Sequence, residues 1–346
     1  MNNYELNEYE FEDKYKDDFI SLMNKLYCNY KHKDSYINAI KKIIDKRNPS
    51  FKLITIKNFI AYKDEEVVGH ISAIIDKRLN NNHFQIGILG FYECVNDKKL
   101  ASLIINRALN YLKEKNCSLV RGPININIWN SYRFAIDQKE NDTFILEPLS
   151  KHYYIDQFYN EGFRVICEYS SAERTNFNSI LPFTKTDYES IINQGFNIRN
   201  LNKNNFKDGI LSIYEISRKT FKDSLSFVDI SKDEFIYIYE DYKKILDQLL
   251  IQIISNKWGV DIGFCSSIID PLDKETIILK TIGVIPEYQN KKVGAALLYM
   301  QHKIAQEMNI NREIYALIKT GNIITKLPYP GIKVIRKYVM MEKNII

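Results

Sequence analysis

The stretch at residues 277–298 constrains the fold more than any other part of the chain. Its first half, 277–285, is apolar and rich in β-branched residues, which predicts a buried strand. Pro286 ends this strand because proline has no N–H to donate to a sheet. The second half has apolar residues at three- and four-residue spacing, which predicts a helix with one buried face: Val293, Ala296, Leu297, Met300 and Ile304.

The loop between strand and helix has the properties of an anion site. The first N–H groups of a helix lack backbone acceptors, and the helix dipole places partial positive charge there. Gly294 allows close approach of the backbone to a ligand, and Lys291 and Lys292 add charge. Neither a Walker loop nor a Gly-x-Gly-x-x-Gly fingerprint is present. The alternative is a plain strand–loop–helix unit with two surface lysines.

This stretch resembles the cofactor segment of the GNAT acyltransferase superfamily. In that family a strand ending in Val-x-Pro precedes Gln/Arg-x-x-Gly-x-Gly/Ala and a helix, and the loop wraps the pyrophosphate of acetyl-coenzyme A. Val284 and Pro286 match the strand end. Gln289 opens the loop and Gly294 is its second small residue, whereas Lys292 replaces the first glycine. The resemblance implies acyl-coenzyme A contacts from Ile282, Gly283, Val284, Gln289, Asn290, Lys291, Lys292, Val293, Gly294, Ala295 and Asn322.

A chain of 346 residues fits two domains, and both halves have a similar order of predicted elements. We expect an α/β protein with mixed sheets and two tandem GNAT-like domains: 1–175 without a cofactor loop, a packed linker at 176–194, and 195–346 with the loop. In the first half a strand at 84–91 also precedes a helix, but the loop at 95–99 has no glycine. Asp97 is the expected N-cap and places a carboxylate where a phosphate would lie.

Composition argues against several classes of function. The 48 Lys and Arg against 43 Asp and Glu give a net charge of +5, which is too balanced for a protein that tracks nucleic-acid phosphates. The five cysteines and five histidines show no metal-ligand spacing. No apolar run has the length of a membrane helix, and the N-terminus is polar and acidic. We therefore expect a cytoplasmic protein without metal, nucleic-acid or membrane partners; nothing favours a particular oligomeric state.

The resemblance also implies a mechanism. The pantetheine arm would enter a gap beside the strand at 277–285 and pair with the backbone of residues 282–284. The Val284 N–H would donate to the acyl carbonyl oxygen, and Tyr329, which follows Asn322 at the family's spacing, would stand near the sulfur. The general base is not identified: neither Glu287 nor Asp261 stands out, and a water relay is an alternative.

The leading interpretation is therefore an N-acetyltransferase. It would move an acetyl or other short acyl group from coenzyme A to an amine of a small molecule or peptide by direct attack. One alternative is a non-catalytic acyl-coenzyme A sensor or scaffold. Another is a Fem-type aminoacyl transferase, which needs no loop at 289–294. His70 is interpreted as a hydrogen-bonded strand residue.

Overall fold

The chain divides into two units, each with its own set of strands and helices. The computed structural model describes residues 4–10, 13–81, 84–175, 177–321 and 331–345. Unit 1 comprises Met1–Tyr169, Ser226–Val228 and Arg336–Ile346, and unit 2 comprises Ser170–Leu225 and Asp229–Ile335. This division differs from the expected boundaries, because the last residues of the chain belong to unit 1 and the segment expected as a linker belongs to unit 2.

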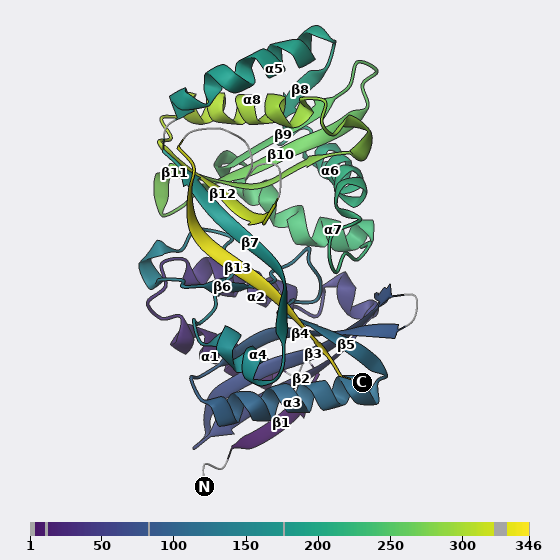
Figure 1. Cartoon of the computed structure of the whole chain (residues 1–346), viewed down its shortest axis with the longest axis vertical. Helices are drawn as coiled ribbons and strands as arrows, with labels where there is room; N and C mark the ends of the chain where they lie inside the picture. Colours follow the sequence, from purple (N-terminus) through teal and green to yellow (C-terminus); the bar gives the residue numbers. More distant parts are fainter. Residues whose placement is uncertain (1–3, 11–12, 82–83, 176, 322–330, 346) are drawn as a thin grey trace. The chain divides into compact units, whose positions relative to one another are not determined.

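The elements of unit 1 are ordered as strand, two helices, three strands, helix and strand, followed by a less regular region (Figure 1). In chain order they are β1 (Glu5–Tyr9), α1 (Asp13–Leu26), α2 (Lys33–Ile43), η1 (Pro49–Lys52), β2 (Ile54–Lys63), β3 (Glu66–Asn81), β4 (Phe84–Cys94), α3 (Lys98–Glu114), β5 (Cys117–Gly122), β6 (Phe134–Ile136), η2 (Glu140–Asp142), α4 (Tyr154–Asn160), the start of β7 (Arg164–Arg174) and most of β13 (Lys333–Asn344).

Unit 2 repeats this order after one additional helix. Its elements are the end of β7, η3 (Phe177–Ser179), α5 (Leu181–Asn193), β8 (Asn197–Asn200), α6 (Phe206–Phe221), α7 (Lys232–Tyr239), η4 (Glu240–Gln248), β9 (Leu249–Ser255), β10 (Asp261–Asp270), β11 (Asp273–Val284), η5 (Pro286–Tyr288), α8 (Val293–Glu307) and β12 (Arg312–Lys319).

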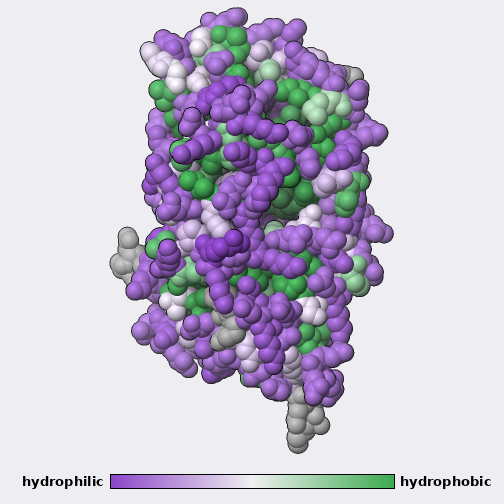
Figure 2. Space-filling view, turned by 180° about the vertical axis from the view of Figure 1, so that it is seen from behind, coloured by the Kyte–Doolittle hydropathy of each residue, from purple (hydrophilic) through white to green (hydrophobic). Residues whose placement is uncertain are grey.

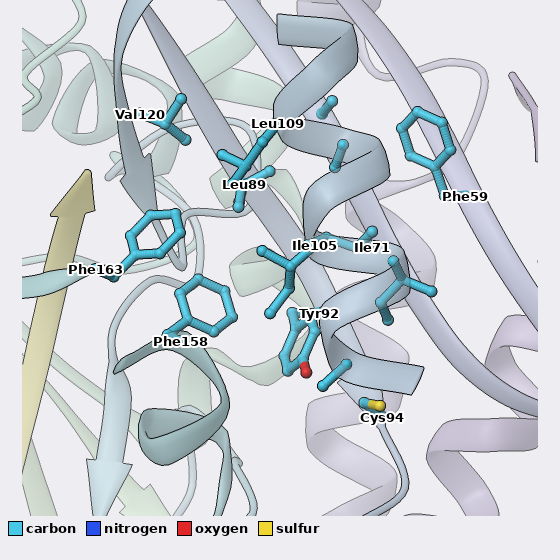
Figure 3. Packing of buried hydrophobic residues seen from close by; sticks show 14 of the residues in the cluster. Phe59, Ile71, Leu89, Tyr92, Cys94, Ile105, Leu109, Val120, Phe158 and Phe163 are labelled. Carbon is cyan, nitrogen blue, oxygen red and sulfur yellow. The ribbon is translucent and has the colours of Figure 1, made fainter. Parts of the chain in front are cut away.

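The sheet of unit 1 has the strand order β1-β2-β3-β4-β5-β13-β7, with β6 also paired to β13. Adjacent strands from β1 to β4 are antiparallel, whereas β4 and β5 are parallel. One face is covered by α3, whose apolar residues at helical spacing form a core with the strands and α4 (Figure 3).

His70 on β3 is buried. Its ring forms hydrogen bonds with the Tyr9 hydroxyl and the Phe91 carbonyl and stacks on Phe19. The prediction of a hydrogen-bonded strand histidine is confirmed.

The sheet of unit 2 has the order β7-β12-β11-β10-β9-β8, in which β11 and β12 are parallel. Figure 1 shows α5 and α8 on one face of these strands and α6 and α7 on the other. The segment predicted to be a packed connection forms α5, which begins at Leu181 and packs on α8, with the rings of Tyr188 and Tyr299 4.7 Å apart. The predicted mixed α/β architecture with two similarly ordered halves is confirmed.

The C-terminal strand completes unit 1. Met341 pairs with Gly122 and Asn344 with Leu119 in antiparallel register between β13 and β5. Glu342 on β13 also forms ion pairs with Arg121 and Arg164 of the same unit. The expected boundaries assign this strand to the domain at 195–346, whereas its pairing with β5 places most of it in unit 1.

On the face shown in Figure 2, hydrophilic residues dominate and hydrophobic residues gather in small groups. Among the residues described, no helix combines the length and the apolar character needed to cross a membrane.

Candidate active site

The edge of β11 is open where the sequence predicted a gap. β11 pairs with β10 as far as Val284, opposite Gly263. With β12 it pairs only from Thr276 to Leu279, so within the described residues the two parallel strands share no further register pairs. Leu317, near the end of β12, has a left-handed backbone (φ 59°) that interrupts the extended strand. The predicted divergence of these two strands is therefore present in unit 2.

Backbone groups of β11 point into this opening. The Ile285 N–H donates to the Ile262 carbonyl on β10 at 2.9 Å. Because successive strand residues direct their N–H groups to opposite sides, the Val284 N–H points away from β10, and the Ile282 N–H does the same. The Val284 carbonyl accepts from Gln289 Nε2 at 2.9 Å. Gln289 thus ties the loop to the end of β11.

The helix that follows the loop has an uncapped N-terminus. Lys292 is the N-cap of α8, no side-chain cap bond is formed there, and the first turn carries no acidic residue. Asn290 and Lys292 adopt left-handed conformations with φ values of 59° and 66°. A Cβ on Gly294 would be 3.9 Å from Ile282 Cδ1, an ordinary contact, so packing alone does not require glycine here. The first N–H groups of α8 therefore remain available to an anion.

The side chain of Lys292 is held by a residue that sequence reasoning missed. Its Nζ lies 2.8 Å from Oδ1 of Asp187 on α5. Lys291 instead places its ammonium 5.4 Å from the centre of the Tyr288 ring. No sequence signal pointed to Asp187, because it lies about a hundred residues away in the segment interpreted as a linker.

In unit 1 the helix N-terminus that corresponds to the start of α8 is capped by a side chain. Asp97 caps α3 by accepting from the N–H groups of Lys99 and Leu100 at 2.8 and 3.1 Å, which confirms it as the predicted N-cap. A hydrogen bond from the Tyr4 hydroxyl is the largest cause that lowers the pKa of Asp97. A carboxylate therefore occupies the helix terminus that is uncapped in unit 2.

The strand edge of unit 1 is also covered. β4 and β5 pair in parallel register only from Gln85 to Ile88. Beyond that point the Leu89 carbonyl accepts from the Ile124 N–H at 2.9 Å, and the Phe91 N–H donates to Asn125 Oδ1 at 2.7 Å. Residues 124–125 thus cover the edge of β4, whereas β11 has no register pair with β12 beyond Leu279 within the described residues.

The remaining predicted site residues divide into two groups. Asn322 and Tyr329 lie outside the described residues. Glu287 in η5 is exposed, and Asp261 receives two hydrogen bonds from Arg199 at 2.5 and 2.6 Å. Burial opposes ionisation of Asp261, but the bonds from Arg199 outweigh it, so the pKa of Asp261 is lowered. A carboxylate with a lowered pKa that is engaged by a guanidinium is a weak proton acceptor.

The α6 face of unit 2 contains a cavity next to the end of β11. Its volume is about 380 Å³, and it is lined by Asp208, Leu211, Ser212, Glu215, Ile216, Lys219, Lys232, Val260, Asp261 and Ile285. This volume lies within the range of small-molecule sites. Ile285 lines the cavity and follows Val284 directly, so the cavity lies next to the end of β11.

Comparison of the whole fold with solved structures identifies its type. A tandem GNAT protein from the clavulanic acid biosynthesis pathway aligns with a TM-score of 0.61 and 8% identity over 99% of this chain and 98% of that chain. The chain has the tandem GNAT fold. A GCN5-related N-acetyltransferase from Anabaena variabilis aligns with a TM-score of 0.57 and 10% identity, covering 99% of this chain and 73% of that one.

A third GNAT-fold neighbour is part of a larger protein. It is a GCN5-related glucosamine N-acetyltransferase region in a fungal multi-domain β-N-acetylglucosaminidase, with a TM-score of 0.58 and 11% identity. The alignment covers 99% of this chain but 38% of that chain. No family sequence model matches the chain, and no curated protein is similar to it in sequence. At these identities the neighbours establish the GNAT fold.

Proposed function

We propose that the protein is an acyl-coenzyme A-dependent N-acyltransferase whose cofactor site lies in unit 2. The observation that carries this proposal is the difference between the two units. In unit 2 the uncapped N-terminus of α8 and the open edge of β11 adjoin each other, whereas unit 1 closes both positions with Asp97 and Asn125. Acyl-coenzyme A has an anionic diphosphate and an extended arm that contains amide groups. The N-terminus of a helix suits the diphosphate, and an open strand edge suits the arm.

The residues of unit 2 fit such a cosubstrate. The N–H groups at 293–295 and the charge of Lys291 would receive the diphosphate, and the backbone of residues 282–284 would pair with the arm. Acyl-coenzyme A would supply a thioester that an amine can attack directly, which forms an amide and releases coenzyme A as the thiol. The Val284 N–H, directed away from β10, would donate to the carbonyl oxygen where negative charge develops. Tyr329 is proposed as the donor near the sulfur, and Asn322 as a contact of the arm.

Neither Glu287 nor Asp261 is suited to remove the proton from the amine. Glu287 is exposed and Asp261 is bound to Arg199. We therefore assign proton removal to ordered water next to β11, through which an amine can lose its proton without a dedicated carboxylate. The acceptor is an amine of a small molecule or peptide that enters from the α6 face, where the cavity adjoins Ile285.

Thermal unfolding with acetyl-coenzyme A tests the cofactor site. A ligand at a hundred times its dissociation constant adds about 2.7 kcal/mol, which raises the Tm of a domain of this size by roughly 5–10 °C. Gly294→Glu should abolish the rise because its carboxylate would lie among the phosphates. Gly294→Ala is the matched control and should keep the rise, since its Cβ has room beside Ile282. A rise that survives Gly294→Glu would place the ligand elsewhere.

Release of free thiol over a panel of amines then tests the reaction. Thiol release that depends on an amine supports the transferase. A Tm rise without thiol release from any amine would identify a sensor or scaffold instead. Absence of any Tm rise would favour the Fem-type alternative, which takes its acyl group from tRNA.

A further inference from the structure

The chain enters unit 1 briefly between two helices of unit 2. Residues 226–228 belong to unit 1, whereas α6 before them and α7 after them belong to unit 2. We refer to residues 226–232 as the connecting segment. Its first three residues lie in unit 1 and its last four lie in unit 2, and each end is held by contacts within its own unit.

In unit 1 the connecting segment is held by an indole and a guanidinium. Trp129 Nε1 donates to the Val228 carbonyl at 2.8 Å, and the ring centres of Trp129 and Phe227 are 5.8 Å apart. Arg121 Nη1 donates to Ser226 Oγ at 3.3 Å. Ser226 and Val228 are buried, and Ser226 has a left-handed backbone (φ 62°). A residue other than glycine keeps this conformation only where the surrounding contacts hold it, so unit 1 fixes this end of the segment.

In unit 2 the other end of the connecting segment is held by α6. Arg218 Nε and Nη2 donate to the two carboxylate oxygens of Asp229, each at 2.5 Å. The Tyr214 hydroxyl donates to the Ile230 carbonyl at 2.9 Å, and Ile230 is buried. A bidentate pair fixes orientation as well as distance. Residues 229 and 230 therefore have a defined position on α6.

The connecting segment ends at the cavity on the α6 face. Its last residue, Lys232, lines this cavity together with Glu215. The Glu215 carboxylate lies 3.6 Å from Lys232 Nζ and 3.7 Å from Arg218 Nη1, so the guanidinium that binds Asp229 also neighbours Glu215. Lys232 follows Val228 by only four residues. A displacement of the segment in unit 1 would therefore move a charged part of the cavity wall in unit 2.

We propose that Trp129 is a positioning residue for the acceptor. It anchors the connecting segment in unit 1 and thereby sets the place of Lys232 in the cavity wall. This inference rests on the proposed transferase function, and it gives unit 1, in which Asp97 and Asn125 close the positions of a cofactor site, a part in that function. Trp129 does not line the cavity itself, so it acts on the acceptor through the segment.

Steady-state kinetics of Trp129→Phe with the best acceptor of the amine panel tests the inference. Phenylalanine keeps an aromatic ring beside Phe227 but cannot donate to the Val228 carbonyl. We expect the KM for the acceptor to rise by about three- to tenfold, with kcat within about twofold of the wild type. The Tm rise with acetyl-coenzyme A should be unchanged, which shows that the variant is folded and binds the cosubstrate. Tyr159→Phe, at an exposed position on α4, is the control and should keep the wild-type KM.

Asp229→Asn tests the end of the segment in unit 2. It removes the charge that Arg218 binds, at a position that is 53% exposed, and it should also raise the KM for the acceptor. Because both contacts hold one segment, the KM of the double variant with Trp129→Phe should rise by less than the product of the two single effects.

Three results would overturn the inference: an unchanged KM in Trp129→Phe, a loss confined to kcat, or KM effects that multiply in the double variant. If no amine releases thiol with the wild-type protein, the proposed function fails and this inference fails with it. Thiol release by the wild type together with a wild-type KM in Trp129→Phe refutes only the inference.

Discussion

Lys292 Nζ and Asp187 Oδ1 lie 2.8 Å apart and join the N-terminus of α8 to α5. Lys292 replaces the glycine that the resemblance leads one to expect, and it keeps the left-handed backbone (φ 66°) that glycine adopts most easily. The ion pair holds the ammonium beside α5. The substitution therefore preserves the path of the loop. It also adds the Lys292 ammonium, whose partner is Asp187 on α5.

Replacing Lys292 by glycine should not destabilise the protein. The left-handed conformation costs a non-glycine residue roughly 1–2 kcal/mol, and an ion pair in which Lys292 is 55% exposed contributes less than about 1 kcal/mol. We expect Lys292→Gly to leave the free energy of unfolding unchanged or raise it by up to about 1 kcal/mol. Urea unfolding measures the change. The control, Lys291→Gly, lies at negative φ and should be destabilising; equal effects of the two changes would contradict the argument.

Removing the charge of Asp187 should strengthen cofactor binding. Its carboxylate lies near the proposed diphosphate position and opposes an anion there, so Asp187→Asn should lower the Kd for acetyl-coenzyme A by about two- to tenfold. Isothermal titration at two salt concentrations measures this effect, which should shrink as salt rises. Glu189→Gln on the same helix is the control, because Glu189 pairs with Lys185 on the helix surface. Weaker binding by Asp187→Asn would mean that Asp187 positions Lys292 for the ligand.

The cap of α3 should matter for stability but not for ligand binding. Asp97→Ala removes the acceptor for two N–H groups and should cost about 1 kcal/mol of stability. Asp97→Ser, which retains a cap, should cost less. Neither variant should add a second acetyl-coenzyme A site, because residues 124–125 still cover the edge of β4. A titration with two equivalents bound would show that the cap alone closes unit 1.

Glu93 should make the stability of unit 1 depend on pH. Burial raises the pKa of Glu93 from 4.5 to about 8, although the hydroxyls of Tyr27 and Tyr154 both donate to its Oε2 at 2.8 Å. The folded state keeps this proton while the unfolded state releases it above about pH 4.5. The free energy of unfolding should therefore fall as pH rises from about 4.5 to about 8, by at most about 5 kcal/mol.

Glu93→Gln tests this dependence because glutamine keeps an acceptor oxygen and cannot ionise. The variant should resemble the wild type at pH 5 and be more stable at pH 8. Trp129 fluorescence reports on unit 1 when Trp258, which is 71% exposed in unit 2, is replaced by phenylalanine. Glu140→Gln, an exposed position in the same unit, should leave the pH profile unchanged. Parallel profiles for wild type and Glu93→Gln would refute the assignment.

Local patterns in the sequence predicted the elements of the site well. The stretch expected as strand, loop and helix forms β11, η5 and α8, with Val293, Ala296 and Leu297 buried as the spacing indicated. Asp97 caps α3 as predicted, because a cap depends on residues only two or three positions away. Periodicity and capping are local properties, so a single sequence expresses them directly.

At residues 124–128 isoleucine and asparagine alternate as they would in a strand, but this alternation does not predict the structure of the segment. The segment forms no strand; Ile124 makes an isolated bridge with Tyr132. Asn125 bonds the Phe91 N–H, and Asn127 bonds the Trp129 N–H. Strand alternation would place the two asparagines on a polar face, but both side chains are buried and their oxygens accept from backbone N–H groups. Side-chain hydrogen bonds of this kind compete with strand pairing and leave no periodic signal.

By itself the sequence determined which segments become strands and helices, where α8 begins, and which half has a free helix terminus. Only the tertiary structure decided which strands pair. β13 completes unit 1, Asp187 meets Lys292, and Asn125 covers β4 because these contacts join residues far apart in the chain. The apolar period of a strand specifies a buried face but not the neighbour at its edge, and that choice is made by the backbone hydrogen bonds and packing of the assembled sheet.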